Sequence, residues 1–219
     1  MTDTSFRRNA SGFTIVELMI ATMVFSIILT VVTMGVISFS NRYYKGVHAS
    51  ATQSAARNIM DTITQAIQFG SATVTPTSST TSFFCAGGSV FLYDTSGAMF
   101  TNSVGQRGVY VTPKTGDVCA DQPLSGGRQL LGSRMRITSL SVSPLSGVAN
   151  MYQVNVVVAY GEDNVLCAPS LPQQCLVSAN YTAPSFINRP DVACKAGSGN
   201  QYCAVSRLQA SVQKRVVPN

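Results

Sequence analysis

The feature that most constrains this chain is an apolar stretch near its N-terminus. The 33 residues between Arg8 and Arg42 carry one charge, that of Glu17. Residues 13–40 of this stretch would measure about 42 Å as an α-helix at ~1.5 Å per residue. The hydrocarbon core of a bilayer is only about 30 Å thick. The stretch therefore predicts a membrane-spanning helix.

An ordinary secretory signal peptide explains this stretch poorly. Such peptides have apolar cores of about 7–15 residues followed by a small-residue cleavage site, and no such site occurs here before Arg42. A plain anchor helix, with Arg7 and Arg8 on the cytoplasmic side, would explain the length. It would not explain an acid inside the span.

The carboxylate of Glu17 is energetically unfavourable in such a helix. A carboxylate near the bilayer centre costs about 2.5 kcal/mol or more and usually has a partner. The residues three and four positions away are Phe13, Thr14, Ile20 and Ala21, and none of them is basic. We therefore expect the partner of Glu17 to be another molecule, a new chain terminus or water at the membrane interface.

The sequence Gly12-Phe13-Thr14-Ile15-Val16-Glu17 resembles the processing site of type IV pilins and type II secretion pseudopilins. In that family a short basic leader ends in glycine. After the glycine come phenylalanine, three further residues, glutamate and a long apolar helix. The resemblance covers roughly residues 7–45. It implies a leader of residues 1–12, in which Arg7 and Arg8 supply the positive charge.

The same resemblance implies how the chain is processed and assembled. A membrane aspartyl prepilin peptidase would cut after Gly12 on the cytoplasmic face, and the same enzyme would N-methylate Phe13. Glu17 would then pair with the terminal amine of Phe13 on the preceding subunit. The implied partners are other pilin subunits, the peptidase, an inner-membrane assembly platform and, before assembly, membrane lipid.

The helix is expected to continue beyond the membrane. No proline occurs between Phe13 and Thr75, and Gly70 is a suitable C-terminal stop. Apolar residues recur at helical spacing and predict one buried face: Ala56, Ile59, Met60, Ile63 and Ile67. Residues 13–41 are interpreted as the membrane segment, which the resemblance implies is also the filament core, and residues 42–70 as an amphipathic continuation.

Residues 71–219 are expected to form a β-rich globular head, after a polar linker at 71–82. Five segments have strand-like composition bounded by turn residues: 89–93, 108–112, 134–142, 152–160 and 204–217. The valines at 156–158 predict a strand covered on both faces. Together with the helix, these segments predict an α+β fold in which a long N-terminal helix packs on an antiparallel sheet.

All six cysteines follow the apolar stretch, which favours disulfides in an oxidising compartment over free buried thiols. Six cysteines allow 15 pairings, and we favour the local ones: Cys85–Cys119, Cys167–Cys175 and Cys194–Cys203. The head is therefore expected outside the cytoplasm, first on a single-pass protein of the cytoplasmic membrane and later in an extracellular filament.

Catalysis has little support, and we predict neither an enzyme nor a bound cofactor or metal. The single histidine, His48, lies close to the membrane stretch, so no catalytic triad can form in the head. The acidic run 162–164 is interpreted as a solvated turn, with a calcium loop as the alternative. The net charge of +6 includes no basic run in the head, so a nucleic-acid groove is not predicted, although DNA contact stays open.

Three functions remain from the sequence. The first is a minor pilin that helps to initiate or cap a type IV pilus used in adhesion, motility or DNA uptake. The second is a minor pseudopilin of a type II secretion filament. The third is a membrane-anchored extracellular binding protein or enzyme. The processing motif disfavours the third, and the first two share every residue interpreted above.

Overall fold

The structure is a computed structural model of the 219-residue chain. It describes residues 12–70, 74–75, 83–93, 108–116, 118–120, 127–162, 165–167, 190–197 and 199–215. Its compact units are residues 1–43 and residues 44–219. Each unit is described by itself below.

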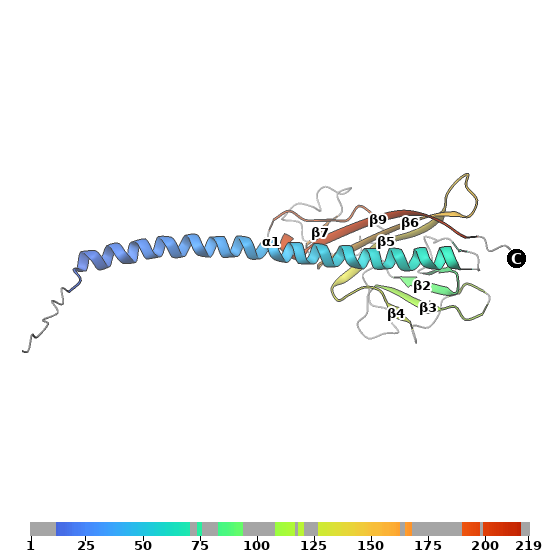
Figure 1. The fold of residues 1–219 in the computed structure, drawn as a ribbon, viewed down its shortest axis with the longest axis horizontal. Coiled ribbons are helices and arrows are strands. Elements are labelled where there is room, and N and C mark those ends of the chain that lie inside the picture. Colours follow the sequence, from blue (N-terminus) through green and yellow to red (C-terminus); the bar gives the residue numbers. More distant parts are fainter. Residues whose placement is uncertain are drawn as a thin grey trace, which may run out of the picture. The chain divides into compact units, whose positions relative to one another are not determined.

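One helix and nine strands form the described part of the chain, with a short 3-10 turn, η2, before the last strand (Figure 1). The elements are α1 (Ile15–Phe69), β1 (Phe83–Ala86), β2 (Ser89–Tyr93), β3 (Val109–Pro113), β4 (Arg128–Gln129), β5 (Met135–Pro144), β6 (Met151–Tyr160), β7 (Leu166–Cys167), β8 (Ala193–Cys194), η2 (Asn200–Tyr202) and β9 (Ala204–Gln213).

The C-terminal part of α1 packs on the sheets through the stripe that the sequence predicts. Thr52 is buried as well, and all five predicted apolar residues share one core with residues of both larger sheets. Arg57, Asp61 and Gln65 lie on the exposed side. The prediction of an amphipathic helix seated on a β-rich head, and of an α+β fold, is confirmed.

Two glycines determine how the end of α1 meets the head. The helix ends at Phe69, and the Gly70 N–H donates to the Ala66 carbonyl at 3.1 Å. A Cβ on Gly70 would lie 2.1 Å from the Cα of Gly87, and one on Gly87 would lie 2.8 Å from the Ala66 oxygen. The helix end and the β1–β2 turn can therefore approach this closely only with glycine at both positions.

The first sheet has four antiparallel strands in the order β1-β2-β3-β4. The strand-like segments predict β2, and they predict a strand at 108–112, one residue before the bounds of β3. They do not predict β1. A Gly87-Gly88 pair joins β1 to β2, with Ala86 opposite Ser89 and Gly87 at φ +59°. A two-glycine connection between apolar runs is a hairpin signal, so this strand was predictable.

The second sheet has the order β5-β6-β9, and all its pairs are antiparallel. Because β6 is central, Val156, Val157 and Val158 are buried on both faces, as their sequence predicts. Along β9, Val212 is buried whereas Arg207 and Gln209 are exposed, so its side chains alternate between the core and solvent. The head thus contains separate sheets, and a small β7-β8 pair forms a third.

The last strand is shorter than predicted. It was expected to run to residue 217, but it ends at Gln213. Beyond it the Arg215 N–H donates to the Gln68 carbonyl at 3.2 Å, and the guanidinium lies 5.1 Å from the centre of the Phe69 ring. The chain leaves the sheet because its backbone here satisfies a carbonyl in the last turn of α1.

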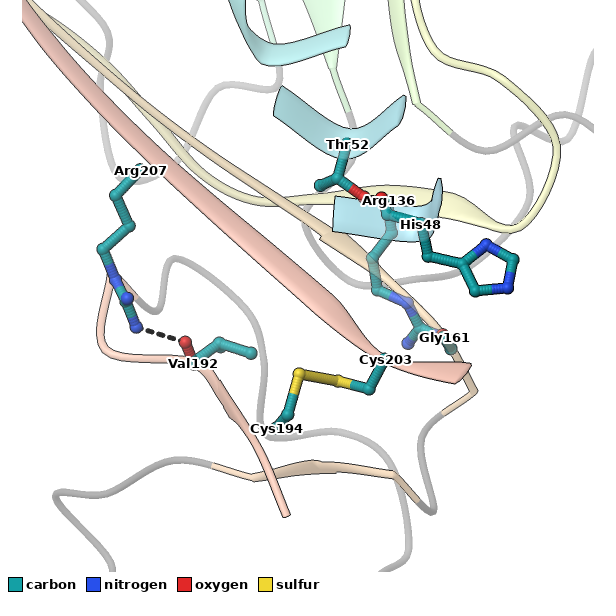
Figure 2. The surroundings of a disulfide bond; sticks show 8 residues. All are labelled: His48, Thr52, Arg136, Gly161, Val192, Cys194, Cys203 and Arg207. Atoms are coloured by element: carbon teal, nitrogen blue, oxygen red, sulfur yellow. Dashed lines mark hydrogen bonds between the residues drawn. A yellow bond between two sulfur atoms is a disulfide. The ribbon is translucent and has the colours of Figure 1, made fainter. Parts of the chain in front are cut away.

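Two of the predicted disulfides are present, Cys85–Cys119 and Cys194–Cys203. Figure 2 shows the second, which ties β8 to the residue before β9. Nearby, Arg207 donates hydrogen bonds from its guanidinium to the carbonyls of Val192 and Pro190. Cys175 lies outside the described residues, so its pairing with Cys167 stays a prediction.

The close contact between the helix end and the first hairpin predicts an unequal response of two adjacent glycines. Gly87→Ala should lower the free energy of unfolding by at least about 1–2 kcal/mol, the cost of a left-handed non-glycine residue, plus the overlap with Ala66. Gly88→Ala is the matched control, because a Cβ there meets nothing within 4 Å. Urea unfolding in detergent measures both variants, and equal midpoints would contradict the packing described.

The two disulfides close chain segments of different length, which predicts different contributions to stability. Their sequence separations are 34 and 9 residues. Replacing Cys85 and Cys119 by alanine should therefore cost roughly 1 kcal/mol more than replacing Cys194 and Cys203, because the larger loop gains more entropy when unfolded. Unfolding of the two paired variants with and without reductant measures this difference. A chain whose stability is unchanged by reductant would refute the disulfides.

Candidate processing and assembly segment

The residues before α1 form an accessible, non-helical segment. Gly12, Phe13 and Thr14 precede the first helical residue, Ile15, and all three are exposed. A Cβ placed on Gly12 would meet no atom within 4 Å. The Gly12–Phe13 peptide bond therefore lies in non-helical, exposed backbone, which a peptidase can reach. Arg7 and Arg8 lie outside the described residues.

Thr14 and Glu17 form a capping box at the start of α1. The Glu17 backbone N–H donates to the Thr14 Oγ1 at 3.2 Å. In return, the Thr14 backbone N–H and its hydroxyl both donate to the Glu17 Oε2, each at 3.0 Å. A threonine at the N-cap and a glutamate three residues later satisfy two otherwise unpaired N–H groups in this way.

This geometry corrects the expectation that Glu17 has no partner within its own chain. No basic residue lies at helical spacing from Glu17, but Thr14 holds one of its carboxylate oxygens. The signal was present in the sequence as Thr-x-x-Glu before an apolar run. In the described part of the chain Oε2 accepts both hydrogen bonds, and Oε1 accepts none.

The first unit presents an apolar surface that its own chain does not cover. Each large apolar side chain from Phe13 to Phe39 is more than half exposed, from 51% for Val24 to 82% for Phe13. Among the described residues, α1 is long and apolar enough to cross a membrane. None of its most apolar 18-residue stretch is buried. Water is therefore a poor environment for this surface.

Four hydroxyl groups within the apolar stretch are satisfied by the helix itself. Ser26, Thr30 and Thr33 each donate to the carbonyl four residues earlier, at 2.7–2.8 Å. Thr22 donates to the Met19 carbonyl at 3.0 Å. A hydroxyl bonded to its own helix costs much less in an apolar medium than one without a partner. These residues are therefore compatible with a lipid or filament interior.

Other predicted residues do not join this segment. Five of the six cysteines are described, and they belong to the second unit: Cys85, Cys119, Cys167, Cys194 and Cys203. Within the described ranges no three His, Cys, Asp or Glu residues are grouped so that they could hold a metal ion. In the acidic run, only Glu162 is described, so the calcium alternative is not tested.

Comparison with known proteins gives one match, at the same segment. Residues 7–33 match the family described as the prokaryotic N-terminal methylation motif. No curated protein and no solved structure matches the chain. The matched residues include Gly12, Phe13 and the capping box, and the helix that they begin packs farther along on antiparallel sheets. This motif and this architecture together support a type IV pilin-like prepilin.

Proposed function

We propose that this prepilin is a structural subunit, specifically a minor pilin that helps to initiate or cap a type IV pilus. The observation that carries the proposal is the apolar first half of α1, uncovered in the single chain and beginning directly after an exposed Gly12–Phe13 bond. Such a surface must be buried in an apolar environment. Lipid buries it before assembly, and neighbouring helices bury it afterwards.

Residence in the membrane comes first in this scheme. Residues 13–41 cross the cytoplasmic membrane, and the short leader stays on the cytoplasmic side with Arg7 and Arg8. The head then lies outside the cytoplasm. Two disulfides within the head support this orientation, because such bonds persist in oxidising compartments.

Processing then prepares the subunit for assembly. Prepilin peptidase hydrolyses the Gly12–Phe13 bond and removes residues 1–12. The absence of a side chain on Gly12 lets the peptidase approach the backbone closely. The new N-terminal amine belongs to Phe13, which is then N-methylated and keeps its positive charge.

The carboxylate of Glu17 gives this amine a partner. Thr14 holds Oε2 through two hydrogen bonds, so the carboxylate is oriented before assembly and Oε1 is the oxygen left to receive a cation. The Phe13 amine of the preceding subunit supplies that cation. Opposite charges attract strongly where water is excluded, so docking relieves the cost of two charges left in lipid.

The Gly12–Phe13 bond gives the first test. Gly12→Ala should mature partly, whereas Gly12→Val should leave full-length precursor, because a branched side chain obstructs the approach of the peptidase to the backbone. Mass spectrometry of the N-terminus, in cells with prepilin peptidase, measures both variants. Wild-type protein should begin at methylated Phe13. Normal maturation of Gly12→Val, or a native chain that begins elsewhere, would contradict the assigned site.

Variants of Glu17 and Thr14 separate charge from helix capping. Glu17→Gln preserves an oxygen for the capping box, as Gln does in such motifs, but it removes the charge. We expect Glu17→Gln and Glu17→Ala to be processed and then to be depleted in surface filaments. Thr14→Ser should assemble normally. The measurement is an immunoblot of sheared filaments against the membrane fraction.

Two outcomes of this experiment would count against the proposal. Incorporation of Glu17→Gln at the wild-type level would show that the charge is not needed for docking. The wild-type chain could also be absent from sheared pili while deletion of its gene abolishes protein secretion. The subunit would then be assigned to a type II secretion pseudopilus and not to a pilus. The peptidase and pairing steps would be the same in both filaments.

A further inference from the structure

A cluster of aromatic rings lies at one end of the three-stranded sheet. It consists of Tyr44 and His48 on α1, Tyr160 at the end of β6 and Tyr202 in η2, and is called the base cluster. The rings of His48 and Tyr160 are stacked, with centroids 4.2 Å apart and planes 15° apart. Tyr202 lies 6.2 Å from Tyr44 and 6.3 Å from His48.

The base cluster is covered on one side only. Tyr202 is 50% exposed and Tyr44 is 44% exposed, whereas His48 and Tyr160 are half-buried. A set of four rings that served only to fill the core would bury them all. The base cluster instead presents two tyrosines that combine an apolar ring with a polar hydroxyl.

The structure around η2 holds Tyr202 in place. The Cys194–Cys203 disulfide ties the residue after Tyr202 to β8. The Tyr202 N–H also donates to the Gly199 carbonyl at 2.9 Å. Figure 2 shows this disulfide together with His48 on the helix and Gly161, the residue that follows Tyr160. The exposed ring is thus carried by a cross-linked turn.

Positive charge accompanies the base cluster. Lys45 follows Tyr44 directly and is exposed. Arg134 is exposed too, and it precedes Met135, which pairs with Tyr160 across the sheet. The acid at this end of the sheet is the exposed Glu162. The cations therefore outnumber the acid among the exposed described residues beside Tyr44 and Tyr160.

We propose that the base cluster, with Lys45 and Arg134, rests on the headgroup layer of an anionic phospholipid bilayer before assembly. The inference relies on the membrane anchor of the proposed function. Tyr44 is only four residues beyond Ser40, where the apolar stretch ends, so the chain itself keeps this surface near the lipid. Tyrosine is enriched at membrane interfaces, and lysine and arginine are attracted to anionic lipid.

The proposed membrane contact differs from an aromatic belt on the helix alone, because Tyr202 belongs to the head. Tyr43 and Tyr44 would be held near the interface by the anchor whatever the head did. Contact of Tyr202 with lipid requires the head to lie down on the bilayer at one defined end of its sheet. Withdrawal of the subunit into a filament would then break this contact.

The chain contains no tryptophan, so a single introduced indole can report on lipid contact. Full-length Tyr202→Trp protein would be reconstituted into phosphatidylethanolamine–phosphatidylglycerol vesicles whose acyl chains are brominated near the headgroup. We expect bromination to reduce its emission about twofold, because interfacial side chains enter the headgroup–acyl boundary by about 5–10 Å. Circular dichroism and the intact disulfides would confirm that the variant is folded.

Val148→Trp is the matched control. Val148 is 46% exposed in the turn between β5 and β6. This turn is at the opposite end of β6 from Tyr160, about 30 Å away at ~3.3 Å per residue. Its emission should be unchanged by bromination.

The outcomes separate this inference from the anchor on which it relies. Suppose that the chain floats with the vesicles at alkaline pH and that Tyr202→Trp is quenched no more than Val148→Trp. The proposed contact of the base cluster with lipid is then wrong, whereas the membrane anchor is supported. If the chain does not float with them, both are wrong. Protection of the Tyr202→Trp indole only in assembled filaments would assign the surface to a second subunit and overturn the proposal. Equal quenching in phosphatidylcholine vesicles would overturn the role of Lys45 and Arg134.

Discussion

The first half of α1 must be kept out of water. Its large apolar side chains are more than half exposed along the whole stretch from Phe13 to Phe39, and burying such a surface is the dominant favourable term in association. The hydroxyls of Thr22, Ser26, Thr30 and Thr33 are already bonded to the helix backbone, so neither lipid nor a packed filament imposes a hydrogen-bonding penalty on these four. The same segment can therefore be stable in two apolar environments, and moving between them is the basis of the proposed assembly.

In the proposed assembly, the acid at the start of this helix has two roles. Through Oε2, Glu17 helps to satisfy the first turn of its own helix, which is a local contribution independent of any partner. Through its charge and its other oxygen, it can recognise an amine that exists only after the leader has been removed. Thr14 thus prepares the carboxylate, and processing creates the cation. Assembly of uncut precursor would be disfavoured because the amine is absent.

The head depends on contacts between segments that are distant in sequence. Gly70 and Gly87 allow the end of α1 to touch the first hairpin, and Arg215 returns the chain to the same helix end. One disulfide holds β1 to Cys119, and the other holds β8 to the residue before β9. The amphipathic part of the helix consequently belongs to the head as a packed element. This arrangement gives the polypeptide a packed head directly after its apolar segment.

Local patterns in the sequence were sufficient for the helix, its buried stripe, the doubly covered β6, two disulfides and the resemblance at Gly12–Glu17. Helical and strand periodicity are properties of short segments, and the N-terminal methylation motif is likewise a short linear pattern. The capping box and the Gly87-Gly88 hairpin were also local signals, and they were overlooked. Tertiary structure alone decided that the strands divide into separate sheets, that Gly70 meets Gly87, that β9 ends where Arg215 turns back, and that Tyr202 joins Tyr44 and His48. These features arise from contacts across large separations in sequence, where the choice of partner depends on the packing of the entire head and not on the residues of any one segment.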